Sequence, residues 1–499
     1  MKRLATLYRR VRRWLLRVLF LLAVVVMTLL IGRAVQSQAG PPLELWHTFV
    51  PVEPDAAAID RLDWDGYLAA EARTFAAVRA GVTERLDQKD RRPDDRYFAG
   101  SPMYPGAFAQ DWNRSYVLEP ASRPAGAVVL LHGLTDSPYS LRHVAKLYQA
   151  RGFLAIGLRL PGHGTVPAAL TGTAWEDWLA ATRLAVREAR RKVSSGVPLH
   201  LVGYSAGGAA ALKYALDALE DPSLPRPDRL VLISPMVGVS SYARFAGLAA
   251  LPALLPPFAK AAWLAIVPEF NPFKYNSFPV NAARQAHRMT VAIQQQLDRI
   301  AASGRLGALA PILTFQSSVD FTVSARAVIE SLYARLPANG SELVLFDLNR
   351  NTRFGPLLRA VFAGATERIL PPPPRDWQLT IIANTRDDPE VKERVTAAGD
   401  TVERIRGLGL AYPREVFSLS HVALPFPATD PLYGSQPDPA EDFGVALGSL
   451  AAHGEVGVLI VSLDTLARLT WNPFFPYMLA RIGETIGPAT ERQWRKSDR

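Results

Sequence analysis

The stretch Leu199–Gly208, Leu-His-Leu-Val-Gly-Tyr-Ser-Ala-Gly-Gly, predicts a strand that turns sharply into a helix. Its first residues are apolar, and Gly208–Glu220 is rich in Ala and Leu without a helix breaker. Ser205 lies at the turn, between two glycines that let neighbouring backbone approach closely. Such a turn lifts a serine hydroxyl clear of a sheet, towards the N-terminus of the next helix. We therefore expect Ser205 to be a nucleophile; the alternative is an ordinary tight turn.

Strand and helix patterns alternate on both sides of this turn. Apolar runs at 116–118, 127–131 and 153–158 predict strands before it, and runs at 230–234 and 311–317 predict strands after it. One of the intervening helices should begin at a capping box made by Thr173 and Glu176 and end near Lys192. This alternation predicts an α/β fold with a mostly parallel central sheet and helices on both faces.

A serine nucleophile needs a base, a carboxylate that orients the base, and donors for the oxyanion. One donor in such a turn is the N–H of the residue after the nucleophile, here Ala206. The second should come from an earlier strand-to-loop turn, and the Leu134 N–H in His132-Gly133-Leu134 has that position. An ordinary loop glycine at Gly133 is the alternative.

The acid and the base should follow the nucleophile along the chain, in that order. Asp320 comes just after the 311–317 strand; a helix N-cap is its other possible role, and Asp347 in the strand-like 343–348 run is a rival acid. Among the eight histidines, His421 and His453 satisfy the order. We expect His421 to be the base, because it separates a strand-like run from a loop-like one.

Five short motifs resemble those of the α/β-hydrolases. The similar branch holds monoacylglycerol lipases, lysophospholipases and S33 serine aminopeptidases. The likeness covers roughly 115–323 and returns at His421. It implies a Ser-Asp-His triad, an acyl-enzyme, and neither a metal nor an organic cofactor. Two departures are the 101 positions between Asp320 and His421, and Ser420 where glycine often precedes the histidine. The motifs are Leu130-Leu131-His132-Gly133-Leu134, Pro161-Gly162-His163-Gly164, Gly203-Tyr204-Ser205-Ala206-Gly207-Gly208, Val319-Asp320 and Ser420-His421.

Further segments are expected around this core. Residues 241–305 are apolar and Pro-rich in their first half, and we expect them to form a cap over the nucleophile. An insertion is expected near 351–413, with four prolines at 371–374, a strand at 379–383 and a charged helix at 389–406. Residues 36–114 should form a tether and a helix at 66–88, without chemistry. Apolar packing and a closing helix are expected at 457–486.

Net charge is concentrated at the N-terminus. Seven of the 56 basic residues lie within the first 17 positions, which hold no acidic residue; 49 basic and 46 acidic residues remain beyond them. This nearly neutral body gives no support to a nucleic-acid partner. The absence of cysteine excludes disulfides, thiolate metal sites and a cysteine nucleophile.

The basic head precedes an apolar run, and residues 14–31 are just long enough to span a bilayer. The excess of Arg and Lys before this run predicts a cytoplasmic N-terminus and a catalytic domain on the outer side of a single-pass membrane anchor, periplasmic or extracellular. A cleaved signal peptide, with Ser37 and Ala39 before the cut, is the competing interpretation. The domains expected are residues 1–35, 36–114, 115–240, 241–305 and 306–499.

Together these features predict a membrane-tethered serine hydrolase that cleaves carboxylic esters. Its substrate should be a small acyl ester or a lipid, since the expected cap is apolar. An S33-type serine aminopeptidase is the first alternative, and it would need an acidic site for the substrate's amine. A non-catalytic scaffold of the cell envelope on a hydrolase fold is the second.

Overall fold

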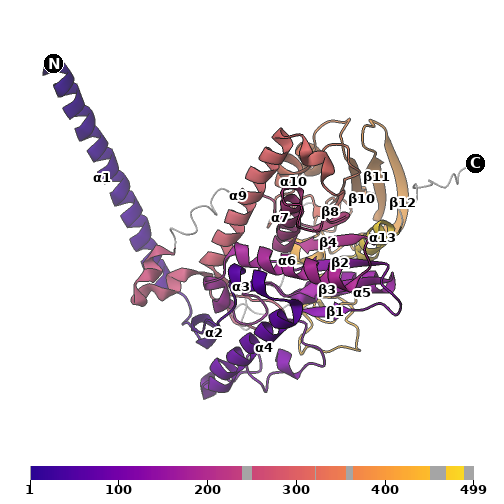
Figure 1. Ribbon diagram of the computed structural model, residues 1–499, viewed down its shortest axis with the longest axis horizontal. Helices are drawn as coiled ribbons and strands as arrows, with labels where there is room; N and C mark the ends of the chain where they lie inside the picture. Colours follow the sequence, from indigo (N-terminus) through magenta and orange to yellow (C-terminus); the bar gives the residue numbers. More distant parts are fainter. Residues whose placement is uncertain (1, 239–249, 321, 356–363, 450–467, 488–499) are drawn as a thin grey trace, which may run out of the picture.

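The computed structural model describes residues 2–238, 250–320, 322–355, 364–449 and 468–487. Its centre is a ten-stranded sheet in the order β1-β3-β2-β4-β5-β8-β9-β10-β11-β12 (Figure 1). Strands β3 to β10 are parallel, and β1, β11 and β12 join antiparallel at the two edges. The strands are β1 Tyr116–Leu118, β2 Gly126–Leu131, β3 Phe153–Leu158, β4 Leu199–Tyr204, β5 Arg229–Ile233, β8 Ile312–Ser317, β9 Glu342–Phe346, β10 Gln378–Ala383, β11 Glu390–Thr396 and β12 Glu403–Ala411.

Both faces of the sheet are buried, as the apolar runs of the parallel strands predict. In β2, Val129 and Leu131 pack on one face, whereas Val128 and Leu130 pack on the other. The first face carries α6 (Trp175–Lys192), α7 (Ala206–Glu220) and α9 (Val280–Ala302), and the second carries α5 (Arg142–Ala150) and α13 (Phe475–Ile486). The predicted α/β-hydrolase fold, with helices on both faces, is confirmed.

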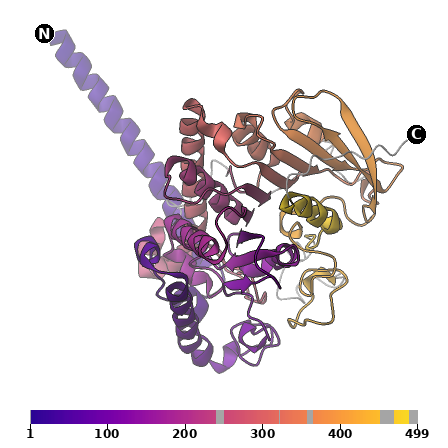
Figure 2. The same ribbon diagram turned by 45° about the vertical axis from the view of Figure 1, so that its right-hand side comes forward.

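The expected charged helix at 389–406 is wrong. This segment forms β11 and β12, a hairpin that extends the main sheet beyond β10 at the edge opposite β1 (Figure 2). In β11, Val391, Glu393 and Val395 are buried, whereas Lys392 between them is exposed. That alternation is the period of a strand, and the charges of this segment obscured it. The strand expected at 379–383 is β10, and it pairs in parallel with β9.

The start of α6 differs from the predicted capping box by one residue. The Asp177 carboxylate accepts the Ala174 N–H at 2.8 Å, whereas the Thr173 hydroxyl donates to the Ala169 carbonyl. A carboxylate in the first helical turn also suits the helix dipole. The helix itself ends at Lys192, as expected.

The second half of the expected cap, α9, lies against α6 and α7 in the helical layer of the sheet. Before it come the short helices η7 (Leu251–Leu254) and η8 (Pro256–Ala262), and a two-stranded ribbon of β6 (Trp263–Ala265) and β7 (Phe278–Pro279). The first residues of the expected cap, 241–249, and the run at 457–467 lie outside the described residues. Covering of the nucleophile by a cap stays a prediction.

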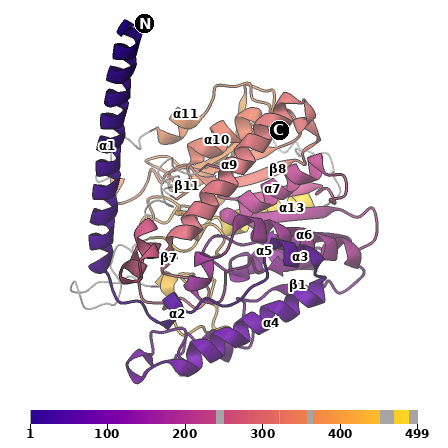
Figure 3. The same cartoon turned by 60° about the vertical axis from the view of Figure 1, so that its left-hand side comes forward.

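The N-terminal region begins with α1 (Lys2–Gln38), which projects from the body (Figures 1 and 3). Within it, Arg10–Gln38 is long and apolar enough to cross a membrane, a property that a signal sequence near an N-terminus shares. Short helices α2 (Leu45–Thr48) and α3 (Ala56–Arg61) lead to α4 (Trp64–Gly81), which lies within the helix expected at 66–88 except at its first residues.

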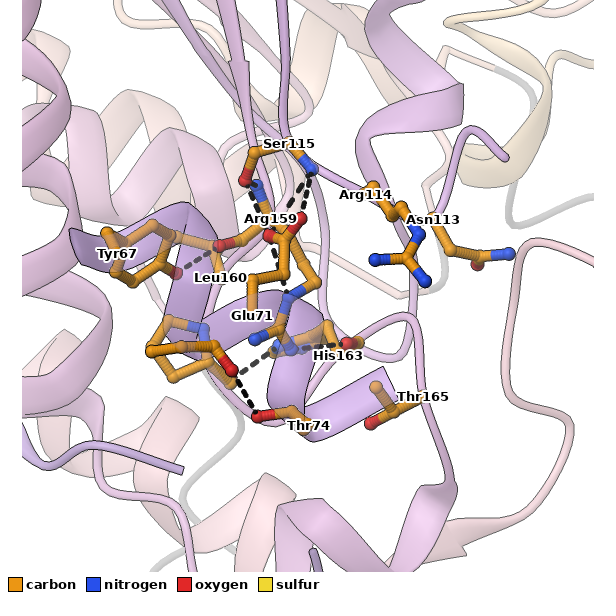
Figure 4. Close-up of polar contacts among 12 residues, drawn as sticks. Tyr67, Glu71, Thr74, Asn113, Arg114, Ser115, Arg159, Leu160, His163 and Thr165 are labelled. Carbon is orange, nitrogen blue, oxygen red and sulfur yellow. Dashed lines mark hydrogen bonds and ion pairs between the residues drawn. The ribbon is translucent and has the colours of Figure 1, made fainter. Parts of the chain in front are cut away.

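A buried ion cluster joins this region to the sheet. Arg159, directly after β3, donates to Glu53 at 2.8 Å. It also donates to Glu71 of α4 at 3.1 Å (Figure 4). Glu71 also accepts from the Ser115 hydroxyl at 2.8 Å, and the Tyr67 hydroxyl donates to the Arg159 carbonyl at 2.7 Å. Burial alone would lower the pKa of Arg159. The charges of Glu53 and Glu71 outweigh burial and hold this pKa well above its ordinary value. Arg159 therefore stays charged inside the protein.

Candidate active site

Ser205 stands between β4 and α7 in a strained backbone conformation. Its φ of 55° and ψ of −117° lie in a region that residues other than glycine rarely adopt. The turn is held by hydrogen bonds from the Ser205 N–H to the Ile233 carbonyl, 2.9 Å, and from the Met236 N–H to the Ser205 carbonyl, 3.0 Å. The strand, turn and helix thus follow the sequence prediction.

The glycines around Ser205 are required by close backbone contacts. A Cβ on Gly207 would lie 2.0 Å from the Leu131 carbonyl oxygen, and one on Gly203 would lie 2.4 Å from the Gly207 carbonyl oxygen. No side chain fits at such distances, so both positions admit only glycine. This close approach brings the end of β2, and the loop after it, against the serine.

His421 and Asp320 lie together, although 101 residues separate them. The His421 Nδ1 is 2.9 Å from the Asp320 Oδ2, and both side chains are almost fully buried. Asp320 follows β8, and His421 begins a short helix, η13 (His421–Ala423). The ring of Tyr204, the neighbour of Ser205, stacks on the imidazole at 5.2 Å, and its hydroxyl donates to the His421 carbonyl at 3.3 Å. The structure therefore brings the expected acid and base together, next to the residue that precedes Ser205.

The Asp320 carboxylate is surrounded by hydrogen-bond donors. Its Oδ1 accepts the backbone N–H groups of Thr322 and Val323, at 2.7 and 2.9 Å. Its Oδ2 accepts from Ser234 at 3.0 Å and from Gln316 at 3.1 Å, in addition to His421. Burial raises the pKa of Asp320, but the hydrogen bond and charge of His421, together with the backbone donors, outweigh burial and hold it below its ordinary value. The carboxylate is therefore ionised at neutral pH and fixed in orientation.

Sequence reasoning missed Ser234 and Gln316. Ser234 directly follows β5 and has a φ of 43°, so strain at the end of this strand aims its hydroxyl at Asp320. Gln316 lies in β8, where an amide side chain interrupts an apolar run. That interruption was the available signal, because a buried amide needs a polar partner.

Ser234→Ala tests the positioning role of this hydroxyl. We expect it to lower kcat by about three- to tenfold with KM unchanged, since one of several donors to Asp320 is lost and the others remain. Steady-state kinetics on a chromogenic ester measure both constants, and the exposed Ser223→Ala provides the matched control. A change in KM alone would show that Ser234 contacts substrate instead.

The two expected oxyanion donors lie on the two sides of the serine. Ala206 is the first residue of α7, and Leu134 follows Gly133, on which a Cβ would lie 3.3 Å from the Ser205 Cβ. Within the described residues, neither N–H donates to another backbone oxygen. Ala206 stands at the N-terminus of α7, where negative charge is favoured, and Leu134 lies in the loop after β2. Their role as oxyanion donors stays a prediction.

Asp136, which sequence reasoning also missed, belongs to the same loop as Leu134. Burial raises its pKa to about 6, against the opposing effects of the Lys274 cation and of hydrogen bonds from Ser137, Ser140 and Gly133. Lys274 in turn has a pKa lowered by burial, although Asp136 opposes this shift. The charge of Lys274 thus acts on a buried carboxylate in the same loop as Leu134.

The rival acid, Asp347, has other partners, and the rival base, His453, is not described by the structure. Asp347 accepts from the Thr366 hydroxyl at 2.6 Å and from Arg350 at 2.8 Å, so its carboxylate belongs to a separate ion pair. His453 lies outside the described residues.

A cavity of about 290 Å³ borders the Asp320–His421 pair. The 415–420 segment lines it together with Arg468 and Leu469. In the part of the chain that the structure describes, no group of three His, Asp or Glu side chains is arranged to hold a metal ion.

Part of the chain is similar in sequence to known proteins. Residues 122–349 match the family model described as serine aminopeptidase, S33. The chain is 26% identical over 201 residues to a thermostable monoacylglycerol lipase of Bacillus sp. (strain H-257), a match that covers 40% of this chain and 72% of the relative.

Solved structures also match about half of this chain. One matching structure comes from work on two metagenome-derived lipolytic enzymes, LipS and LipT. It matches with a TM-score of 0.38 and 21% identity, covering 52% of this chain and 97% of the other. The monoacylglycerol lipase of Paleococcus ferrophilus matches with a TM-score of 0.35 and 17% identity, covering 51% and 98%. Likenesses at this level carry no argument about substrate.

Proposed function

Since the chain belongs to the α/β-hydrolase superfamily and resembles its monoacylglycerol lipase and S33 aminopeptidase branch, we propose that it is a serine hydrolase of carboxylic esters with Ser205, His421 and Asp320 as its catalytic triad. The observation that carries the proposal is the 2.9 Å contact between His421 and Asp320, formed beside the strained turn that presents Ser205. The relative that is a monoacylglycerol lipase supports an ester of a fatty acid as substrate.

In the proposed reaction, the Ser205 Oγ attacks the ester carbonyl carbon while the His421 Nε2 takes its proton. The Asp320 carboxylate accepts the Nδ1–H and stabilises the imidazolium, and the Leu134 and Ala206 N–H groups bind the oxyanion. When the intermediate collapses, the ester C–O bond breaks and His421 gives the proton to the leaving alkoxide. Water then attacks the acyl-enzyme through the same base, which releases the acid and restores Ser205.

The proposal includes the membrane. The apolar span within α1 and the cluster of basic residues before it favour a single-pass anchor, with the N-terminus in the cytoplasm and the hydrolase domain outside. An anchored enzyme of this kind would act on lipids or on acyl esters in the cell envelope. No cofactor is included in the proposed reaction.

The S33 family model favours a second candidate, an aminopeptidase. Such an enzyme needs a carboxylate free to bind the substrate's amine. The charge of the Lys274 cation acts on Asp136, the buried acid near Leu134, and would oppose the binding of a cationic amine there. This charge favours the esterase.

Activity on matched substrates separates the candidates. We expect the full-length enzyme in detergent to hydrolyse p-nitrophenyl acyl esters, with kcat/KM rising with chain length, and to leave aminoacyl p-nitroanilides intact. Hydrolysis of the anilides alone would replace the esterase by the aminopeptidase. No hydrolysis of either series by folded protein would instead support a non-catalytic scaffold.

A further inference from the structure

The 250–268 segment carries an unusual surface. Lys260 is its only charged residue, and five of its large apolar side chains are exposed. Leu254 is 79% exposed and Leu255 58%. The others are Leu251, Leu264 and Val267. Soluble proteins rarely expose so many large apolar groups together, and such patches mark surfaces for a partner or a membrane.

The opposite side of this segment is fixed to the body. Trp263 is 4% exposed and packs with Trp46 and Val166 in a hydrophobic cluster. Its ring also meets the His47 ring edge-on at 4.9 Å. The segment therefore combines side chains that anchor it in the protein with exposed apolar side chains, here called its outward face, as an interfacial element does.

Contacts with the C-terminal end of α1 decide which partner covers the outward face. Arg33 donates to the Trp263 carbonyl, and Gln38 donates to the Pro257 carbonyl at 2.8 Å. Lys260 donates to the Gly40 carbonyl at 2.8 Å. Figures 1 and 3 show the segment at the base of α1, where this helix meets the body. The 250–268 segment is thus bound to residues 33–40, directly beyond the apolar run of α1.

The length of α1 sets the depth of these contacts. If residues 14–31 span the hydrocarbon core, Arg33–Gly40 lies within roughly 14 Å of its outer boundary, at 1.5 Å per residue. The headgroup region is roughly 5–8 Å deep on each side of the core, so Arg33 lies inside it and Gly40 lies beyond it unless α1 is tilted. Apolar side chains of the segment near Arg33 are therefore within reach of the boundary between headgroups and acyl chains, where interfacial elements bury their apolar face.

We propose that the outward face of the 250–268 segment is inserted in the outer leaflet of the bilayer, beside the point where α1 leaves it. The partner is the lipid surface, and the proposal rests on α1 being an uncleaved membrane anchor, as proposed above. Three hydrogen bonds hold the segment to the residues directly beyond the apolar run of α1, and this position favours lipid over a protein partner. Lys260, the segment's single cation, is directed to the backbone at Gly40.

Fluorescence quenching by lipids tests this placement. The chain has no cysteine, so single-cysteine variants each carry one bimane label. The full-length protein is reconstituted in phosphatidylethanolamine–phosphatidylglycerol vesicles that contain doxyl-labelled phosphatidylcholine. Leu254→Cys reports the patch, and Leu22→Cys reports the middle of α1. Val402→Cys, 61% exposed between β11 and β12, is the matched apolar control on the body.

We expect the labels at positions 254 and 22 to lose roughly half or more of their fluorescence in doxyl vesicles, and the label at 402 to keep it. Quenching at 22 with none at 254 would overturn the placement of the segment and leave the anchor standing. Absence of quenching at both positions would overturn the anchor and this inference together. Quenching at 254 alone would support lipid contact by the segment and overturn the anchor.

Discussion

Asp320→Asn is expected to lower kcat for ester hydrolysis by about 10⁴-fold while the protein stays folded. Two backbone N–H groups hold one end of this side chain, and the other end faces the His421 Nδ1. An asparagine would keep its oxygen on the backbone donors and turn its NH₂ towards the imidazole. His421 would then accept at Nδ1 and carry its proton on Nε2, where it cannot deprotonate Ser205.

Asp347→Asn is the matched control for this prediction. Asp347 is also buried, and it was the rival acid in the sequence, but its carboxylate binds Thr366 and Arg350. We expect the kcat of the Asp347→Asn variant, measured per folded protein, to stay within a few-fold of wild type. If Asp347→Asn lost activity while Asp320→Asn kept it, the assignment of the acid would be wrong.

Arg159→Met is expected to lower the free energy of unfolding by about 3–5 kcal/mol, the typical cost of removing one partner from a buried ion pair. The substitution would leave Glu53 and Glu71 buried with no cation between them. It would also detach α4 from the end of β3, because Ser115 and Tyr67 belong to the same cluster. A urea titration in detergent, followed by circular dichroism, measures the change.

Arg183→Met gives the matched control. Arg183 of α6 also joins the N-terminal region to the sheet domain, through a 2.6 Å ion pair with Asp60, but this pair is partly exposed. An exposed pair contributes only about 0–1 kcal/mol. Equal effects of the two substitutions would contradict a special role for the buried cluster.

The sequence predicted the centre of the molecule well, because its signals are local. The apolar run of β4, the turn glycines and the Ala-rich α7 lie within about twenty residues, and backbone sterics alone require this conformation. The strand that precedes Asp320 was equally clear from its own residues. Parallel strands buried on both faces read as continuous apolar runs, so their order along the chain could be recognised.

The predictions that failed depend on distant partners. Glu393 is buried in β11 because Arg481 of α13, 88 positions away, binds it at 3.0 Å. Without knowledge of that partner, the charges of 389–406 suggested a charged helix. For the same reason, nothing in the local sequence shows that Glu53 and Glu71 close on Arg159, or that Ser234 supports Asp320. Local patterns predict elements, whereas buried polar contacts between remote elements appear only in the fold.

The central claim is that Ser205 is an activated nucleophile, and covalent labelling tests it most directly. A fluorophosphonate probe, followed by peptide mass spectrometry, reports which serine is phosphonylated in the full-length protein. We expect a single adduct on the peptide that contains Ser205, absent in Ser205→Ala and strongly reduced in His421→Ala. Equal labelling of wild type and Ser205→Ala, or no labelling of folded wild type, would contradict it.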